Sequence, residues 1–501
     1  MQGAGEAREA GKKARERPVW IMLQSLCVTL PLGGCLLTGG KPEPGLDIPA
    51  TYSAGPRNPA AAEAAVPPLD WWRAFRSREL TALIEEASAA NLDIAVAVAQ
   101  IVQADAQARI VGAALLPTVD LNGNAVRNQL SKTTGSSSVV NVSPSGASVA
   151  IIQNNLQAVL SASYEIDFWG KNRAALRAAE ESAVASRYNR EVVGLTTVAS
   201  VANAYFLVLA AQDRLRIARQ NVASADRILN LIRQQFSAGT ASDLNVAQQE
   251  SLVDTQRATI PPLEQALQQN KAVLALLLAR PYERVTIRGG GMGTLAIPRV
   301  TPGLPSELIA QRPDIRLAEA QLASANANVE NARAQFLPSI KLTGDAGYES
   351  AFLKLLLRPE SVIYTVAASL TQPIFHGGAL LGNLDLQKGV QDQLLQNYRK
   401  AVISGFTDVD KALIAVRETA LAEQLQRKVV ASSRRAFELS DQQLRAGTVN
   451  LIALLQVQQT LFQAEDALAQ ARLARLQAIV SLYQALGGGW LPKPVEAANA
   501  R

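Results

Sequence analysis

An internal repeat constrains the fold of this 501-residue chain more than any other feature of its sequence. Four segments of the first half recur in the second half, in the same order and with similar residues. The pairs are 93–100 with 314–321 and 116–123 with 337–344, both at an offset of 221, then 168–170 with 375–377 at 207, and 234–240 with 442–448 at 208. The offset shifts once, where one loop is longer in the first copy. Self-similarity of this kind indicates two copies of one structural unit.

Each copy contains two segments in which apolar and polar residues alternate, which predicts a pair of β-strands. We expect strands at 117–130 and 154–167 in the first copy and at 338–350 and 361–374 in the second. The polar segment 131–149 forms the longer loop of the first copy. One apolar and one polar face fits a strand with lipid on one side and water on the other. A half-buried sheet of a soluble protein shows the same alternation, so four strands alone do not separate the two.

The strands of both copies are followed by a helix that is too long for a compact domain. Residues 172–237 contain no proline and one glycine, and as a helix they would extend about 100 Å. The second copy has its equivalent over about 380–445. Apolar residues at heptad spacing run from Leu215 to Phe236, so this helix requires coiled-coil partners. The predicted fold class is mainly α, built from a duplicated unit of two strands and a long helical hairpin.

Both long helices end at an Ala-Gly-Thr sequence, in which glycine suits the left-handed position after a helix. The chain then returns as a second helix, from Asp243 in the first copy and from Val449 in the second. Pro261-Pro262 and a Gly- and Pro-rich linker interrupt the return path. The expected divisions are a first repeat at 70–287, the linker at 288–305, a second repeat at 306–490 and a tail at 491–501.

The amino terminus has the features of a secretion signal with a lipid attachment site. A positively charged region precedes an apolar stretch, Val19 to Leu32, that is too short to span a bilayer. Leu32-Gly33-Gly34-Cys35 resembles the bacterial lipobox, which implies that 1–34 is removed and that Cys35 carries diacylglycerol and N-acyl lipid. Leu36 favours the outer membrane, and 35–69 would form an extended tether. An ordinary signal peptide with a chance cysteine is the alternative.

Composition and the lengths of apolar runs exclude several classes of protein. No stretch of 18 or more apolar residues follows Cys35, so we expect no membrane helix, and a chain that crosses a bilayer must then do so as a barrel. Two cysteines and one histidine are too few for zinc sites, Cys–His nucleophiles or Ser–His–Asp triads. A net charge of +6 without basic runs beside aromatics argues against nucleic-acid binding. We expect no metal and no cofactor besides the lipid, and an enzyme would have to use carboxylates alone.

Two strands and a long helical hairpin, repeated behind a lipobox, resemble the outer-membrane efflux protein family of TolC/OprM-like outer-membrane factors. The resemblance covers about residues 70–490 and depends on the order of four motifs, 164–170 (YEIDFWG), 312–315 (RPDI), 372–375 (QPIF) and 481–490 (SLYQALGGGW). It implies a homotrimer in which four strands from each subunit close one 12-strand outer-membrane β-barrel and the helices form a periplasmic α-helical barrel. Trimerisation also has a physical reason, because four strands cannot close a barrel and open edges are not tolerated in lipid.

The same resemblance implies the passive channel of a tripartite efflux pump, which conducts small molecules such as drugs and other toxic compounds to the exterior. Its partners would be a periplasmic adaptor, an inner-membrane transporter of the resistance–nodulation–division (RND) type and outer-membrane lipid, with no nucleic acid. The transporter sets the cargo, which this sequence does not reveal. A periplasmic adaptor, or an envelope structural lipoprotein with helical hairpins, is the alternative, although an adaptor would have one hairpin flanked by soluble domains.

In this family the closed entrance lies at the helix ends just past the two Gly-Thr turns. The matching positions here are Gly239, Thr240, Asp243, Asn245, Gly447, Thr448, Val449 and Gln456. Relatives often carry aspartates where this chain has Asn245 and Gln456. A neutral amide ring binds cations weakly, so we predict a pore that is less sensitive to divalent cations than those of acidic-ringed relatives. Alternatively, these residues only cap and pack the helix ends.

The remaining candidates are aromatic residues and the single histidine. Trp169 lies where a predicted strand leaves the membrane and fits an interfacial girdle. We expect Trp71-Trp72 to anchor the amino-terminal segment to the helices, and His376 to form a hydrogen bond at a strand-to-helix turn. No catalytic and no metal-binding residue is expected.

Overall fold

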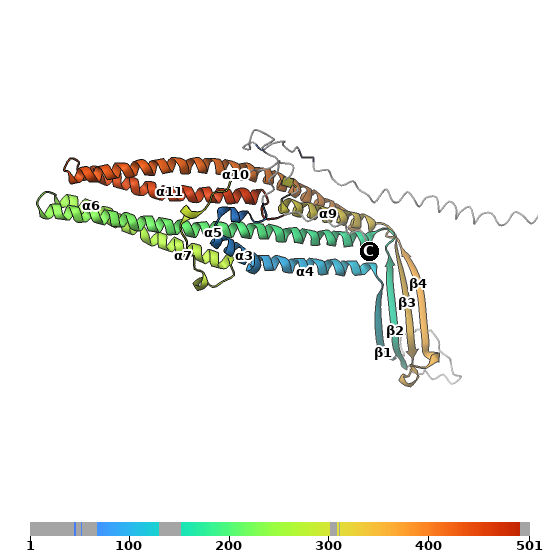
Figure 1. The fold of residues 1–501 in the computed structure, drawn as a ribbon. Coiled ribbons are helices and arrows are strands. Elements are labelled where there is room, and N and C mark those ends of the chain that lie inside the picture. The colour runs from blue at the N-terminus through green and yellow to red at the C-terminus, as the bar shows by residue number, and fades with distance from the viewer. Residues whose placement is uncertain are drawn as a thin grey trace, which may run out of the picture. The chain divides into compact units, whose positions relative to one another are not determined.

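The computed structural model describes residues 45–46, 52, 68–129, 152–300, 308–309 and 311–490. The signal segment 1–34, Cys35, most of the tether, the loop 131–149 and the tail 491–501 lie outside the described residues. The helices and strands of the first copy are α3 (Arg78–Ala90), α4 (Leu92–Gly112), β1 (Thr118–Gln129), β2 (Ile152–Ile166), α5 (Lys171–Ser237), α6 (Asp243–Ala258) and α7 (Ile260–Leu277). Those of the second copy are α9 (Pro313–Ala334), β3 (Ser339–Ser350), β4 (Val362–Thr371), α10 (Ala379–Arg445) and α11 (Leu451–Ala485) (Figure 1). A 3-10 helix, η3 (Trp71–Phe75), precedes α3, and η6 (Met292–Thr294) follows α7.

Strand pairing fixes which residues of the two copies are equivalent. Thr118 of β1 pairs with Ser163, and its counterpart Ser339 of β3, at an offset of 221, pairs with Thr371. Ser163 and Thr371 are therefore equivalent, at an offset of 208, and the first residues of α5 and α10 differ by the same offset. The match of the Phe-Trp-Gly and Phe-His-Gly segments at an offset of 207 is thus wrong by one position. It aligns Phe168 with Phe375, which places the segments one residue away from the register of the strands.

The described chain packs as two compact units, and each repeat contributes to both. The β unit comprises residues 106–129, 152–181 and 323–393. Most of the helical unit comes from residues 68–105, 182–300 and 394–490. The strands of both copies therefore share one sheet, and the long helical hairpins of both copies share one helical unit.

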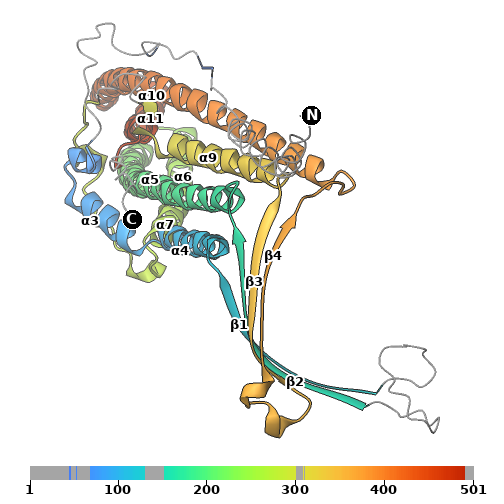
Figure 2. The ribbon, with the colours of Figure 1, turned by 90° about the vertical axis from the view of Figure 1, so that its right-hand side faces the viewer.

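The β unit contains one antiparallel sheet in the order β1-β2-β3-β4 (Figure 2). One row of paired residues crosses it from Leu121 through Leu160 and Ala346 to Tyr364. The apolar residues of all four strands consequently share one face, as the alternation predicts. This face is open in the single chain, where Leu121 is 77% and Val366 85% exposed.

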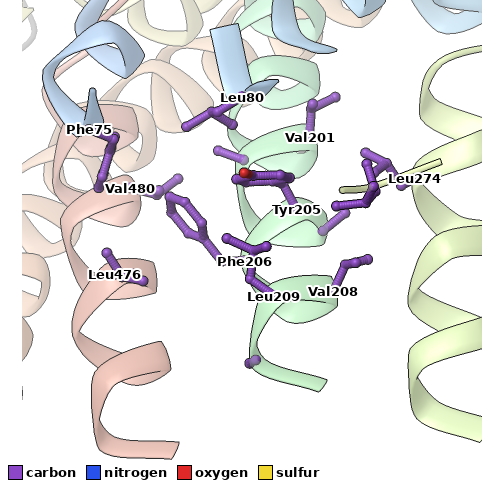
Figure 3. Packing of buried hydrophobic residues seen from close by; sticks show 14 of the residues in the cluster. Phe75, Leu80, Val201, Tyr205, Phe206, Val208, Leu209, Leu274, Leu476 and Val480 are labelled. Atoms are coloured by element: carbon purple, nitrogen blue, oxygen red, sulfur yellow. The ribbon is translucent and has the colours of Figure 1, made fainter. Parts of the chain in front are cut away.

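The helical unit is held together by a large apolar core around the middle of α5. Phe206 of α5 is fully buried, and its ring centroid lies 5.1 Å from that of Phe75 of η3. Leu274 of α7 and Val480 of α11 belong to the same cluster, on different sides of α5 (Figure 3). The sequence of α5 has no charged residue between 195 and 211. Successive turns of this part of the helix can therefore bury side chains against neighbours on several sides. Burial of such side chains contributes roughly 1.5–3 kcal/mol each to folding.

The aromatic segment before α3 is part of this core. Trp71 is fully buried and stacks on Tyr483 of α11, with ring centroids 4.7 Å apart. Trp72 is partly buried and packs against the same cluster. The structure therefore confirms that this tryptophan pair anchors the amino-terminal segment to the helices.

Two helical segments of the described chain are long and apolar enough to cross a membrane by length and composition, Arg78–Leu115 and Lys171–Ser237. Small polar residues interrupt the apolar runs of both segments without lowering their mean hydropathy far, so length and composition leave the expectation of no membrane helix untested. Half of the apolar window in α5 is buried inside this chain. Core helices of soluble proteins pass the same test, so neither segment by itself indicates a membrane span.

The two copies close their helical hairpins with equivalent contacts made by different residues. Asn91, before α4, donates its Nδ2 to the Leu277 carbonyl at the end of α7, at 2.8 Å. Its equivalent Arg312, before α9, donates Nη1 to the Ala485 carbonyl at the end of α11, at 2.9 Å. Arg312 also makes two hydrogen bonds to Asp314, at 3.0 and 2.7 Å. This contact joins the RPDI motif to the SLYQALGGGW motif.

The return path after the first hairpin packs against the helical unit. The prolines at 261–262 lie in the first turn of α7, where proline is tolerated. Only Thr259 separates α6 from α7, so the return helix is interrupted at one residue. The described chain from the end of α7 to residue 300 contains only two short 3-10 helices, Tyr282–Arg284 and η6, yet it buries Val285 and Met292 in the core of the helical unit. Within the expected linker 288–305, the described residues Met292 and Leu295 are buried, so this part of the linker packs against the helical unit.

Candidate functional site

The two Gly-Thr turns of the helical unit have the same backbone geometry. Gly239 and Gly447 adopt φ angles of 75° and 72°, a region that strains residues with a side chain. The N–H groups of Thr240 and Thr448 each donate to a carbonyl five residues back, at 2.9 Å. The glycine N–H groups donate three residues back, at 2.9 and 3.0 Å. These bonds form a Schellman motif, so glycine ends each long helix as the sequence predicts.

Each return helix begins at a polar cap. The Ser242 Oγ accepts a hydrogen bond from the Asn245 N–H at 3.3 Å, and the Asn450 Oδ1 accepts one from the N–H three residues later at 3.0 Å. The second return helix begins at Leu451, so its expected start at Val449 is wrong by two residues. The reason is that Asn450 acts as the cap and therefore lies outside the helix.

One small apolar cluster, which we call the tip cluster, holds the two turns together. It is formed by Ile228 and Ile232 of α5, Leu444 of α10, and Leu451 and Leu454 of α11. Leu454 is fully buried and Ile232 is 1% exposed. Because the cluster takes residues from both hairpins, the turns cannot separate without exposing apolar surface.

Two buried glutamines lie next to the tip cluster and were not predicted. Gln249 of α6 is fully buried and donates its Nε2 to the Ala225 carbonyl of α5, at 2.9 Å. Gln458 of α11 is also fully buried, and within the described residues neither polar atom of its amide has a hydrogen-bond partner. The sequence signal was its position, one helical turn from both Leu454 and Phe462 on an apolar stripe. A polar side chain in such a seam specifies register at a cost in stability.

The charged and amide residues at the turns are held differently. The Asn245 side chain contacts the Ser242 hydroxyl, so its amide takes part in the helix cap. Asp243 and Gln456 are exposed, with no side-chain hydrogen bond or ion pair among the described residues. Asp243 lies in the first turn of α6, where a negative charge complements the helix dipole. The Asn245 side chain thus contacts the residue that caps α6, whereas the side chains of Asp243 and Gln456 are exposed.

The strand-to-helix turn of the β unit places Trp169 and His376 near one cavity. Trp169 is half-buried and donates its Nε1 to the Pro338 carbonyl at 2.8 Å. The cavity, of about 290 Å³, is lined by both residues and by the ion pair of Lys171 with Glu165. His376 itself is exposed. Trp169 thus ties β2 to β3 at the end of the sheet, where an interfacial residue would lie.

No catalytic or metal-binding centre emerges from the described part of the chain. Among those residues, no group of three or more His, Cys, Asp or Glu side chains is placed to hold a metal ion. The proposed lipid site, Cys35, lies outside them.

Comparison with known proteins identifies the kind of molecule that has this arrangement. The sequence model of the outer membrane efflux proteins matches residues 83–280 and 304–488. The pyoverdine export outer membrane protein OpmQ of Pseudomonas putida is 40% identical over 470 residues, covering 93% of this chain and 97% of the relative. The toluene efflux pump outer membrane protein TtgF of the same species is 32% identical over 475 residues, covering 93% and 96%.

Solved structures show the same fold. The open state of the MtrE outer membrane channel of Neisseria gonorrhoeae superimposes with a TM-score of 0.77 at 29% identity, covering 90% of this chain and 97% of that one. The CmeC outer membrane channel of Campylobacter jejuni gives a TM-score of 0.83, covering 91% and 95%. Its identity of 24% supports the fold alone.

Proposed function

Because this chain belongs to the outer membrane efflux protein family, we propose that it is the outer-membrane channel of a tripartite efflux pump. It conducts small molecules, such as drugs and other toxic compounds, passively from an inner-membrane transporter and a periplasmic adaptor to the exterior. Relatives named for pyoverdine export and toluene efflux support this role and argue against the adaptor alternative. In the structure, the proposal depends on the exposed apolar face of the four-stranded sheet, which suits contact with lipid.

Three copies form the conduit. The sheet of one chain has two open edges, β1 and β4, and lipid does not tolerate open edges. Three sheets of four strands would close one 12-strand barrel, with the long helices of the three copies forming a periplasmic α-helical barrel. Exposed apolar residues on α4 support contact with a neighbouring copy. They are Leu92, Val96, Val102 and Ile110.

The periplasmic entrance lies at the two Gly-Thr turns. Asn245 and Gln456 supply neutral amides there, and Asp243 supplies the charge. We therefore expect the channel to be less sensitive to divalent cations than acidic-ringed relatives. Single-channel recording tests this: replacing both amides (Asn245→Asp with Gln456→Asp) should increase block by divalent ions, and strong block of the unmodified channel at low concentration would contradict it.

The anchor and the partners complete the proposal. Cys35 carries diacylglycerol and an N-acyl chain such as palmitate, which holds the protein in the outer membrane while its helices extend into the periplasm. Trp169 lies at the membrane interface. The partners are a periplasmic adaptor and an RND transporter, and the chain itself performs no catalysis. The lipobox-like sequence and the family of the chain support these assignments.

The test is export in a bacterial strain that lacks its own outer-membrane channel but retains the cognate adaptor and transporter. Expression of the full chain should lower the accumulation of a fluorescent pump substrate, and the protein should fractionate with the outer membrane. A Cys35→Ser variant should no longer incorporate labelled palmitate. A chain recovered from the periplasm as a soluble single subunit, with no effect on accumulation, would refute the proposal.

A further inference from the structure

A folded loop, residues 351–361, joins β3 to β4 at the end of the sheet that lies away from the helices (Figure 2). The Leu355 carbonyl accepts hydrogen bonds from the Ser361 Oγ at 2.8 Å and from the Arg358 N–H at 3.1 Å. The loop is therefore held in shape by its own hydrogen bonds. Its apolar side chains are left for another molecule to cover. Three of them are mostly exposed, namely Phe352 at 56%, Leu353 at 74% and Leu357 at 78%.

The same loop carries two basic side chains without acidic partners. Lys354 and Arg358 are exposed, and neither forms an ion pair with a described residue. The loop contains one acid, Glu360, so the two bases leave it with a net positive charge. Exposed leucines beside unpaired cations are typical of segments that lie at a membrane interface, where acyl chains meet anionic headgroups.

The apolar surface of the loop continues onto the sheet. Val362, the first residue of β4, and Tyr364 are 53% and 80% exposed, and both lie on the apolar face. Tyrosine favours the boundary between lipid and water, because its ring is apolar and its hydroxyl is polar. The loop therefore adjoins a part of the sheet that suits the edge of a bilayer.

Charge is distributed unequally between the two faces of the sheet. On the apolar face, which carries Leu121, the only charged residue of the described strands is Arg127 of β1. The other charged residues alternate onto the opposite face. Within the described strands, the face that suits lipid thus carries no acid, and its single charge is a base. The residues on the opposite face are Asp120, Glu165, Lys341, Asp345 and Glu349.

Strand register places Arg127 near the level of the loop. The last row shared by β1, β2 and β3 joins Ala125, Leu156 and Ser350. Ser350 is the last residue of β3, so the loop begins directly beyond this row, and Arg127 lies two residues beyond it on β1. Arg127 is exposed and has no ion-pair partner among the described residues. Three unpaired cations therefore gather at one end of the sheet.

We propose that Arg127 and the loop 351–361, which together we call the outer-end surface, bind the anionic lipid of the outer leaflet. The exposed apolar side chains of the loop enter the acyl layer, and the three cations contact the phosphate groups. Long basic side chains reach the headgroups while their stems remain among apolar groups, and arginine binds phosphate through paired hydrogen bonds. The inference deepens the proposed function and rests on it, because this end of the sheet reaches the outer leaflet only if the helices extend into the periplasm.

Lipid selectivity of the full-length protein tests the role of the cations. The protein is reconstituted in phosphatidylcholine vesicles that contain a trace of spin-labelled phosphatidylglycerol or spin-labelled phosphatidylcholine. Electron paramagnetic resonance then measures the fraction of each label that is held at the protein surface. We expect the wild type to prefer phosphatidylglycerol. The variant R127Q/K354Q/R358Q should lose about half of that preference, because a cation near a membrane surface strengthens the binding of anionic lipid about fivefold at its own site and the measurement averages over many sites.

The matched control removes the same charge from the helical unit. The variant R78Q/R227Q/R435Q replaces three exposed arginines, on α3, α5 and α10, that have no ion-pair partner among the described residues. In the proposed function this unit lies outside the bilayer, so the control should keep the wild-type preference. Both variants should unfold at the wild-type temperature, since exposed charges contribute little to stability.

Fluorescence quenching tests whether the loop enters the lipid. Leu357→Trp places an indole on the loop, and the control Thr365→Trp places one on the polar face of β4. After subtraction of the wild-type signal, phosphatidylcholine with a nitroxide on its acyl chain should quench Leu357→Trp more strongly than Thr365→Trp. Iodide in the aqueous phase should quench the two variants in the reverse order.

The outcomes separate the outer-end surface from the proposed function. A preference lost in R127Q/K354Q/R358Q but kept in the control, with lipid quenching of Leu357→Trp, supports the surface. An equal preference in the two triple variants would show that these cations do not bind lipid. An indole in Leu357→Trp that is open to iodide but not to the nitroxide lipid would place the loop in water. Either of these two results overturns the inference and leaves the channel intact, whereas a protein that does not insert into vesicles refutes the proposed function itself.

Discussion

Replacing Arg312 with alanine should destabilise the helical unit far more than the same replacement at an exposed arginine. The side chain is 11% exposed, and its guanidinium contacts Asp314, Asp408 and the Ala485 carbonyl at the end of α11. Burial alone would lower the pKa of Arg312, but the two aspartates outweigh it and hold the pKa above its usual value. The two aspartates therefore favour the charged form of the Arg312 guanidinium.

The size of the loss in stability follows from the groups that Arg312→Ala leaves without a partner. Breaking a buried ion pair costs about 3–5 kcal/mol, but Asp314 and Asp408 retain 35% and 42% side-chain exposure and can be rehydrated. Rehydration of the two aspartates reduces the cost of breaking these ion pairs to about 2 kcal/mol. The Ala485 carbonyl then loses its partner near the core, at a further cost of about 1–3 kcal/mol. The total is about 3–5 kcal/mol, from contacts that tie α9 to α11.

The assay is thermal unfolding of the full-length protein in detergent, followed by tryptophan fluorescence, because Trp71 lies in the same helical core. The matched control is Arg417→Ala, which removes an exposed arginine from α10 and should cost less than about 1 kcal/mol. Arg312→Lys should recover little, because an ammonium cannot make the paired bonds to Asp314. If Arg312→Ala unfolded at the same temperature as Arg417→Ala, the argument from burial would be refuted.

Three further predictions concern the helix end, a buried acid and the tip. Gly487 has a φ of 72°, and an added Cβ would lie 2.6 Å from the Gln311 carbonyl oxygen, so Gly487→Ala should cost about 2–4 kcal/mol by thermal unfolding. Its equivalent Ala279 has a φ of 52°, so Ala279→Gly should stabilise by about 0.5–1 kcal/mol, and a loss of stability there would contradict the strain argument. Burial alone would raise the pKa of Glu423, but hydrogen bonds from Arg427 and Arg475 outweigh it and hold the pKa below its usual value. The ionised Glu423 therefore stabilises the fold above the pKa of the unfolded chain, and this stability is lost as pH falls through the lower folded pKa. The gap in unfolding temperature between wild type and Glu423→Gln should be full at pH 7 and should shrink below about pH 4, and a gap that is constant with pH would refute this. Leu454→Ala removes a fully buried residue of the tip cluster and should cost about 2–5 kcal/mol there. The variant should increase single-channel open time while leaving the trimer mass unchanged, and unaltered gating would show that the cluster does not hold the turns closed.

Local patterns predicted most of the secondary structure. Alternation located the four strands and their common apolar face, and the absence of proline located the two 67-residue helices. The Gly-Thr turns followed from the conformational freedom of glycine. The heptad seam was correct from Leu215 to Ile232, but its last member, Phe236, is 46% exposed, because it lies beyond the tip cluster where α5 ends.

Contacts between segments far apart in the chain could not be predicted from the sequence. Asn91 and Arg312 occupy equivalent positions and make the same contact with different chemistry, so similarity between the repeats could not reveal it. The position of Gln458 on an apolar stripe was a sequence signal, but it could not show that both polar atoms of its amide lack a hydrogen-bond partner among the described residues. The glycines and prolines of the linker predicted only an interruption of the helices, and they did not reveal that Met292 is 1% exposed in the core. Such features depend on tertiary packing, which no local window contains.

The central claim is that three copies of this duplicated chain close one hollow conduit through the outer membrane. Electron cryomicroscopy of the full-length protein in lipid nanodiscs tests it most directly. We predict a threefold ring with twelve strands around an open lumen, with Leu121 and Val366 facing lipid and β4 of each copy beside β1 of the next. A single subunit whose apolar sheet face is covered by protein would contradict the claim.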